Sequence, residues 1–254
     1  MGAGHAHPLY LPGDSPVHRL PAEVKVVAAI LGVFCVVATP REAFPVFGGY
    51  LLLLGAVWAV AGIPPGWIAV RSLIEAPFVV LAVLSPFTGP DPTVEWFGLT
   101  LSEPGLLGAW NILAKGTLGV LTSLTLAATT PLRDLLLGLQ RLGAPAIIVT
   151  IATLMLRYID VIAAEARRMR LARLSRGDDP RFLWQLGATT RGVGSLFIRS
   201  YERGERVHLV MVARGWSGRM PRLSDTAATT RQWTAGLAPV VVALALAVTG
   251  WLIT

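Results

Sequence analysis

The sequence predicts an all-α integral membrane protein, with about five transmembrane helices and a cytoplasmic-side module of long amphipathic helices. Three observations indicate this class. First, 54% of the 254 residues are hydrophobic and only 15% are charged, whereas a soluble domain carries about a quarter charged residues. Second, the apolar residues gather into long uninterrupted blocks. Third, 15 of the 22 Lys and Arg residues fall within 157–231, and cytoplasmic loops of membrane proteins collect such cations.

Each apolar block is about long enough to cross a hydrocarbon core of ~30 Å, the first only marginally. The blocks lie at 24–39, 43–62, 67–87, 106–130 and 236–254. The segment 88–105 contains acidic residues but no Lys or Arg, so we expect it outside the cell and the N-terminus inside. A shorter apolar run at 144–156 has arginines on both flanks. We expect a helix that does not cross the membrane but is partly sunk in it or packed on the other helices.

The basic region 157–231 is predicted to form helices, because acidic residues are interspersed among its arginines and apolar residues recur at helical spacing. We expect one helix over about 146–175 and a second over about 182–213, with a candidate break at 192–194. The net charge of +7 would suggest nucleic acid for a soluble protein; here the membrane accounts for it, and no nucleic-acid partner is expected. The predicted division of the chain is 1–130 with four transmembrane helices, a helical module at 131–231, and a last transmembrane helix at 232–254.

Both long helices are predicted to end in an Arg-Gly pair, Arg176-Gly177 and Arg214-Gly215. Glycine suits the left-handed position that stops a helix, and a cation in the last turn complements the helix macrodipole. The pairs can therefore be ordinary helix ends. They can also be contacts for a partner, because a guanidinium can grip a carboxylate with two hydrogen bonds. Their place on cytoplasmic helices of a membrane protein favours the second interpretation.

Two ionisable residues lie inside apolar blocks, where charge is costly and is usually paired or functional. Glu75 and Lys115 fall at similar depths on antiparallel neighbours, so we predict an ion pair between them, with a proton or ion relay as the alternative. His5 and His7 form a His-x-His pair, but two imidazoles alone make a weak site, and no metal site is predicted. Sequence motifs of ATPases, hydrolases and metalloproteases do not occur.

Four stretches of the sequence carry a resemblance to a known family. They are SPVHRLPAEVKV at 15–26, TTPLRDLLLGLQRLGAP at 129–145, TLMLRYIDVIAAEARRMRLARLSRG at 153–177 and VMVARGWSG at 210–218. With them, nearly the whole chain resembles the transmembrane (T) component of energy-coupling factor (ECF) transporters, and most closely the CbiQ-type subunit of cobalt importers. The paired arginine motifs are the specific part of this resemblance.

The resemblance implies a role for each arginine motif. In this family a short signature, often Ala-Arg-Gly, ends a coupling helix and engages a groove on one of two cytoplasmic ATP-hydrolysing subunits. Ala213-Arg214-Gly215 matches this signature, and Ser175-Arg176-Gly177 departs from it at the first position. By the same resemblance, 131–145 is a first, shorter coupling helix. An apolar stripe suits such a helix, and here it consists of Leu132, Leu135, Leu136, Leu139 and Leu142.

The resemblance also implies a non-catalytic subunit of the prokaryotic plasma membrane, with its N-terminus and coupling module in the cytoplasm. Besides the lipid bilayer, its partners would be the two ATPases and a separate CbiM-like substrate-binding membrane (S) subunit, alone or with a small accessory membrane subunit. This chain would bind no cofactor, because ATP and Mg²⁺ would belong to the ATPases. Cobalt or nickel is the expected cargo, and a vitamin is the alternative. Two other functions stay open: a membrane enzyme using Glu75, Asn111 and Lys115, and a permease that binds its own substrate.

Overall fold

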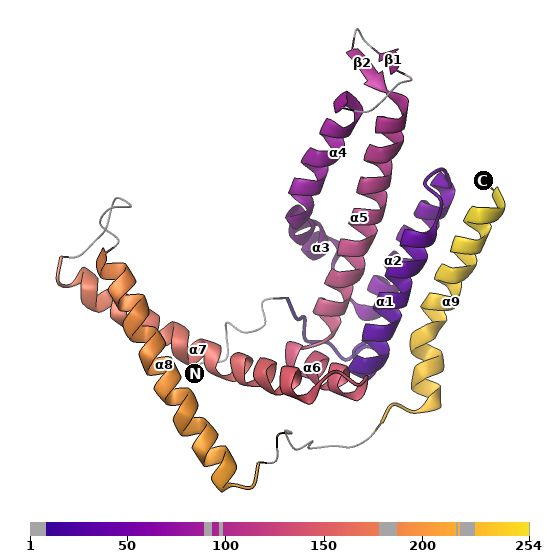
Figure 1. Cartoon of the computed structure of the whole chain (residues 1–254). Helices are drawn as coiled ribbons and strands as arrows, with labels where there is room; N and C mark the ends of the chain where they lie inside the picture. The colour runs from indigo at the N-terminus through magenta and orange to yellow at the C-terminus, as the bar shows by residue number, and fades with distance from the viewer. Residues whose placement is uncertain are drawn as a thin grey trace. The chain divides into compact units, whose positions relative to one another are not determined.

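The computed structural model describes residues 9–88, 93–96, 99–177, 187–216, 218 and 227–253. The chain forms two compact units (Figure 1). One, which we call the bundle, comprises residues 9–142 and 226–254; the other, which we call the helix pair, comprises 143–225 together with 1–8. Most of the helix pair is therefore inserted in the chain between two parts of the bundle.

The elements of each unit follow the chain order. The bundle contains α1 (Ala22–Ala38), α2 (Phe44–Ala61), α3 (Pro65–Arg71), the 3₁₀ helix η1 (Ser72–Glu75), α4 (Ala76–Thr88), β1 (Thr93–Trp96), β2 (Leu99–Ser102), α5 (Glu103–Thr129), α6 (Leu132–Arg141) and α9 (Thr230–Ile253). The helix pair contains α7 (Ala146–Leu174) and α8 (Gly187–Ala213).

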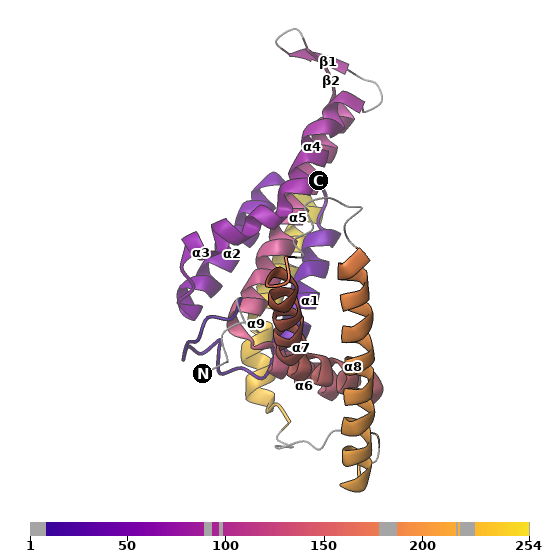
Figure 2. The ribbon, with the colours of Figure 1, turned by 90° about the vertical axis from the view of Figure 1, so that its left-hand side faces the viewer.

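The all-α class predicted from the sequence is confirmed, with one small addition. Strands β1 and β2 form an antiparallel hairpin in which Thr93 lies opposite Ser102. The hairpin lies at the far end of α4 and α5 (Figure 2), within the acidic segment that we expect outside the cell. Ser102 then starts α5, because its side-chain oxygen accepts the N–H of Gly105 at 3.2 Å and so satisfies a free donor of the first turn.

Five helical segments are long and apolar enough to cross a membrane, judged by length and composition. They are Phe44–Ala61, Pro65–Phe87, Glu103–Thr129, Ala146–Leu174 and Thr230–Ile253. Four of them correspond to predicted apolar blocks. The first predicted block, which is only marginally long enough to cross, forms α1, and this helix of 17 residues is not among the five. The fifth is α7, whose helix continues well past the short apolar run from which we expected no crossing. That the run 144–156 does not cross the membrane therefore stays a prediction.

The two long helices of the basic region occur where the sequence predicts them. Helix α7 begins directly after Pro145 and ends at Leu174, and α8 ends at Ala213. The candidate break at 192–194 is wrong, since α8 is continuous from Gly187 onward. Residues 182–186, the expected start of the second helix, lie outside the described residues.

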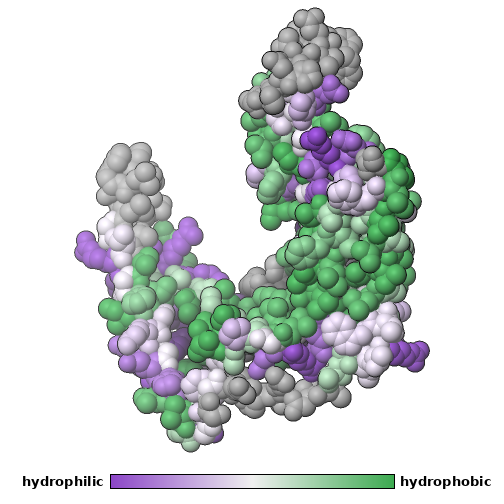
Figure 3. All heavy atoms as spheres, turned by 45° about the vertical axis from the view of Figure 1, so that its right-hand side comes forward, coloured by the Kyte–Doolittle hydropathy of each residue, from purple (hydrophilic) through white to green (hydrophobic). Residues whose placement is uncertain are grey.

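The outer surface of the bundle is strongly apolar (Figure 3). Large hydrophobic side chains point outward from several of its helices; among the most exposed are Phe34 at 66%, Ile74 at 73%, Leu52 at 78% and Leu252 at 80%. Exposure on this scale is unfavourable in water but matches a hydrocarbon solvent, which rewards no burial of apolar groups. The bundle is therefore built for a lipid environment.

Inside the bundle, hydrogen bonds as well as apolar packing hold the helices together. The hydroxyl of Tyr50 on α2 donates to the carbonyl of Ala243 on α9 at 3.1 Å and lies 3.0 Å from the hydroxyl of Thr39, which follows α1. Thr39 in turn donates to the carbonyl of Cys35. In lipid each of these groups needs an internal partner, so this chain of hydrogen bonds joins α1, α2 and α9.

Two glycines allow helices to approach α1 closely. A Cβ atom at Gly236 of α9 would clash with the side chain of Val24. One at Gly138 of α6 would lie 2.8 Å from the backbone nitrogen of Glu23. Small residues at such crossings let helix backbones approach each other, so these positions place α9 and α6 against the beginning of α1.

We predict that Gly236→Leu lowers the stability of the bundle by about 1–3 kcal/mol, because the added side chain must displace Val24 from a packed contact. Thermal unfolding of the detergent-solubilised protein, followed by tryptophan fluorescence, measures the effect. Gly32→Leu in α1 is the matched control, since nothing lies within 4 Å of its added Cβ. Equal melting temperatures for both variants would contradict the close contact.

Candidate functional site

Four helices of the described chain end at a glycine with a left-handed backbone: α2 at Gly62, with a φ angle of 69°, and three helices in or just before the basic region. Gly143 after α6, Gly177 after α7 and Gly215 after α8 have φ angles of 94°, 78° and 80°. Residues with a Cβ rarely adopt this conformation, because the Cβ comes too close to the following carbonyl oxygen. The prediction that Gly177 and Gly215 stop their helices is therefore confirmed.

The end of α8 forms a complete Schellman motif. The N–H of Gly215 donates to the carbonyl of Val212 at 2.9 Å, and the N–H of Trp216 donates to that of Met211 at 3.0 Å. At the end of α7, the N–H of Gly177 donates to the carbonyl of Leu174 at 3.0 Å. In both cases the residue directly before the glycine is an arginine, which lies just after the end of the helix.

Arg176 and Arg214 are both exposed. Within the described part of the chain, neither guanidinium forms an ion pair or a hydrogen bond. Other arginines of the same helices are engaged: Arg168 and Arg199 donate to the carboxylate of Glu165 at 2.6 and 2.7 Å. The two terminal arginines thus remain available to a partner.

The helices α7 and α8 pack in antiparallel directions. Glu165 meets Arg199, Met169 lies beside Gly192, and Leu154 shares a groove with Met211. From the contact between Glu165 and Arg199, Arg176 is 11 residues further along α7 and Arg214 is 15 residues further along α8, or roughly 17 and 23 Å of helix. The two exposed arginines therefore lie at opposite ends of the helix pair.

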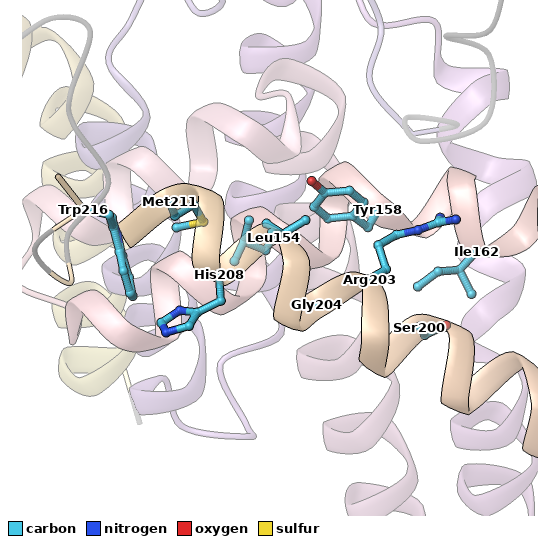
Figure 4. Close-up of a pocket in the computed structure, with 10 residues that line it drawn as sticks. Leu154, Tyr158, Ile162, Ser200, Arg203, Gly204, His208, Met211 and Trp216 are labelled. Atoms are coloured by element: carbon cyan, nitrogen blue, oxygen red, sulfur yellow. The ribbon is translucent and has the colours of Figure 1, made fainter. Parts of the chain in front are cut away.

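A mainly apolar groove of about 190 Å³ lies between α7 and α8 (Figure 4). The α7 side contributes Leu154, Tyr158 and Ile162, and the α8 side extends as far as Met211 and Trp216. The ring of Trp216 meets that of His208 edge to face at 5.8 Å. The buried indole N–H of Trp216 finds no acceptor among the described residues. The groove reaches the end of α8 that carries Arg214.

The structure reveals one junction that the sequence analysis missed. Glu23, in the first turn of α1, is 4% exposed; its carboxylate accepts a hydrogen bond from Arg141 of α6 at 2.9 Å and another from the backbone N–H of Ala228 at 3.1 Å. The sequence feature that could have indicated this junction is an acidic residue directly before the first apolar block. By contrast, Asp14 is exposed, and two hydrogen bonds from Arg19 at 2.8 Å hold its pKa below the usual value.

The structure does not bring Glu75 and Lys115 together. The hydroxyl of Thr117 donates to Glu75 at 2.8 Å, and the ammonium group of Lys115 donates to the carbonyl of Val37 on α1 at 2.8 Å. Residues 115 and 117 of a helix project about 200° apart, so Lys115 points away from the side of α5 that faces Glu75. The predicted ion pair assumed only that Glu75 and Lys115 lie at similar depths in the membrane. The direction in which each side chain projects from its helix decides whether they meet, and here they do not.

The described residues contain no group of three or more His, Cys, Asp or Glu side chains that could hold a metal ion. His5 and His7 lie outside the described residues. Cys35 is buried in α1 and unpaired.

The comparison with known sequences agrees with the architecture of a membrane protein. The model of the CbiQ family, described as cobalt transport protein, matches residues 13–223. The chain belongs to the CbiQ family. The match spans the bundle helices α1 to α6 and both long helices of the helix pair, α7 and α8.

Relatives of this family extend across bacteria and archaea. The chain is 32% identical to the cobalt transport protein CbiQ of Rhodobacter capsulatus over 187 residues, 71% of this chain and 74% of that protein. It is 31% identical to the energy-coupling factor transporter transmembrane protein EcfT of Bacillus selenitireducens over 227 residues, 82% of each. A protein of Methanocorpusculum labreanum, named as a fused cobalt transport protein CbiMQ, is 26% identical over 81% of this chain and 36% of its own length.

These findings confirm the resemblance predicted from the sequence. The chain is an ECF transporter T component of the CbiQ type and a multi-pass membrane protein.

We predict that Gly215→Val disrupts the end of α8. A side chain at a left-handed position costs about 1–2 kcal/mol, so the amide of Trp216 should exchange its hydrogen about tenfold faster. Hydrogen–deuterium exchange of the peptide spanning 209–218 measures this change. Gly194→Val within α8 is the control, because its added Cβ meets nothing within 4 Å; faster exchange in this control as well would refute a specific role for Gly215.

Proposed function

We propose that this T component couples two cytoplasmic ATPase subunits to a separate substrate-binding membrane subunit. ATP binding and hydrolysis would move the two ATPases together and apart. The helix pair would transmit that motion to the bundle and so tilt the substrate-binding subunit. This chain would perform no chemistry itself.

The observation that carries the proposal is the pair of exposed arginines at opposite ends of one antiparallel helix pair. Each lies just past the end of its helix, Arg176 two residues after Leu174 and Arg214 directly after Ala213, so nothing of its own helix extends past it. Two guanidinium groups so far apart suit two separate acidic clefts, one on each ATPase, better than a single shared site. A bidentate contact with a carboxylate fixes direction as well as position, which a mechanical link requires.

Apolar surface beside Arg214 would enlarge the same contact. Leu209 and Val210 are exposed at 66% and 51%, and the groove between α7 and α8 opens beside Trp216. Arg and Trp are among the residues that contribute most to binding energy at interfaces, and apolar side chains make up much of the buried core around them. The arginine would then supply specificity and the neighbouring side chains most of the buried area.

The names of the relatives support the partners that we propose. The fused CbiMQ protein joins two cobalt transport segments in one chain, which suggests a CbiM-like protein as the substrate-binding partner here. The names of two relatives also favour cobalt as cargo, with nickel as its chemical neighbour. The relatives named EcfT carry no cargo in their names, so uptake of a vitamin is the alternative outcome. We place the helix pair in the cytoplasm, where ATP is available.

We predict that Arg176→Ala or Arg214→Ala abolishes cargo uptake, and that the double variant also loses the ATPase subunits. Removal of a guanidinium would leave a carboxylate in the ATPase cleft without its partner, at a cost of about 2–5 kcal/mol. The transporter is purified through a tag on this chain; co-purifying subunits, ATP hydrolysis and uptake of radioactive Co²⁺ into vesicles are then measured.

Two other arginines on the same helices provide matched controls. Arg170 of α7 and Arg206 of α8 are exposed but do not precede a helix-ending glycine, so their alanine variants should retain both uptake and the ATPase subunits. Normal uptake by both single variants at Arg176 and Arg214 would defeat the proposal.

A further inference from the structure

The carboxylate of Glu23 holds two segments that are far from it in the sequence. One oxygen, Oε2, accepts from the guanidinium of Arg141 at 2.9 Å, and the other, Oε1, accepts from the backbone N–H of Ala228 at 3.1 Å. Arg141 is the last residue of α6, and Ala228 lies two residues before α9 begins. A single side chain at the start of α1 therefore joins three parts of the bundle.

These two segments are also the places where the helix pair is attached to the bundle. The bundle ends its first part at Leu142, one residue after Arg141, and resumes at Thr226, two residues before Ala228. The segment 143–225, which contains α7 and α8, is thus covalently linked to the bundle at its two ends, and each connection has its bundle-side end bound by the same carboxylate. We call these three residues, Glu23, Arg141 and Ala228, the clasp.

Burial makes the clasp a firm contact. Glu23 is 4% exposed, whereas the surface pair of Asp14 and Arg19 is mostly exposed. A buried carboxylate is stable only when it is paired and hydrogen-bonded, so the charge of Glu23 penalises any movement that separates Arg141 or Ala228 from it. The first turn of α1 adds its positive dipole end to the same charge.

Close packing limits movement at the same place. A Cβ at Gly138, one turn before Arg141, would lie 2.8 Å from the backbone nitrogen of Glu23. On the other side, Gly236 of α9 lies directly against Val24. Both segments held by the clasp are therefore packed against the first turn of α1 as well.

We propose that Glu23 is a positioning residue that fastens both connections of the helix pair to α1, so that force on the helix pair reaches the membrane helices without loss. This inference rests on the proposed function, in which the ATPases act on the helix pair. With the clasp closed, a displacement of α7 or α8 pulls on α1, α6 and α9 together. With the clasp open, the connections absorb part of that displacement.

The experiment compares transport with ATP hydrolysis in the complete transporter, reconstituted in vesicles with its ATPase and substrate-binding subunits. We expect Glu23→Gln to lower the number of Co²⁺ ions taken up per ATP hydrolysed by about tenfold, as the loss of one charge-assisted hydrogen bond would. The amount of ATPase bound to the complex should stay at its normal level. Glutamine keeps an oxygen for the Ala228 N–H but cannot accept from Arg141 in the same way.

Asp14→Asn is the matched control, because it removes an equally short contact between a carboxylate and an arginine from an exposed site. Its uptake per ATP should stay normal. Arg141→Gln should resemble Glu23→Gln, and the double variant should be no worse than the more impaired single variant, since both act on one contact.

The inference is overturned if Glu23→Gln has a normal ratio of uptake to hydrolysis. It is equally overturned if yield, hydrolysis and uptake fall in parallel, because that pattern marks a residue needed only for folding. Failure of the proposed function gives a different result: the double variant of Arg176 and Arg214 would then keep its ATPase subunits and its uptake, whatever the variants of Glu23 do.

Discussion

The burial of one negative charge holds together three segments of the bundle that are far apart in the sequence. Glu23 lies inside the first turn of α1, where a carboxylate is tolerated only with close partners. The end of α6 and the segment before α9 supply those partners. The helix pair is inserted in the chain between these two segments, so the satisfied charge fixes the bundle-side ends of both connections.

The lipid environment imposes the second constraint on the bundle. Apolar side chains cover its outside, so hydrophobic burial contributes little to helix association, and close packing and internal hydrogen bonds must take over. The contacts of Tyr50 with Thr39 and Ala243 and the small residue Gly236 serve these two needs. The same physics explains why two ionisable groups of the apolar blocks have hydrogen-bonding partners, Glu75 with Thr117 and Lys115 with Val37.

The helix ends illustrate how similar local sequences acquire different roles. Helices α6, α7 and α8 all end at a glycine with positive φ, and all carry an arginine at or next to the last turn. Arg141 reaches a buried carboxylate and becomes part of the architecture, whereas Arg176 and Arg214 stay exposed. A cation at a helix end is thus no evidence of function by itself. Its role depends on which groups its side chain can reach.

Local features of the sequence determined much of this protein. Apolar blocks set the lipid-embedded helices, glycines at 177 and 215 set the ends of α7 and α8, and the motifs around them identified the family, because each depends on neighbouring residues alone. Tertiary structure decided the rest. Whether Glu75 faced Lys115 depended on the direction of each side chain around its helix, and the partners of Glu23 lie more than 100 positions away. Hydrophobic periodicity encodes which face of a helix is buried, but not which charged group on another helix will meet it there.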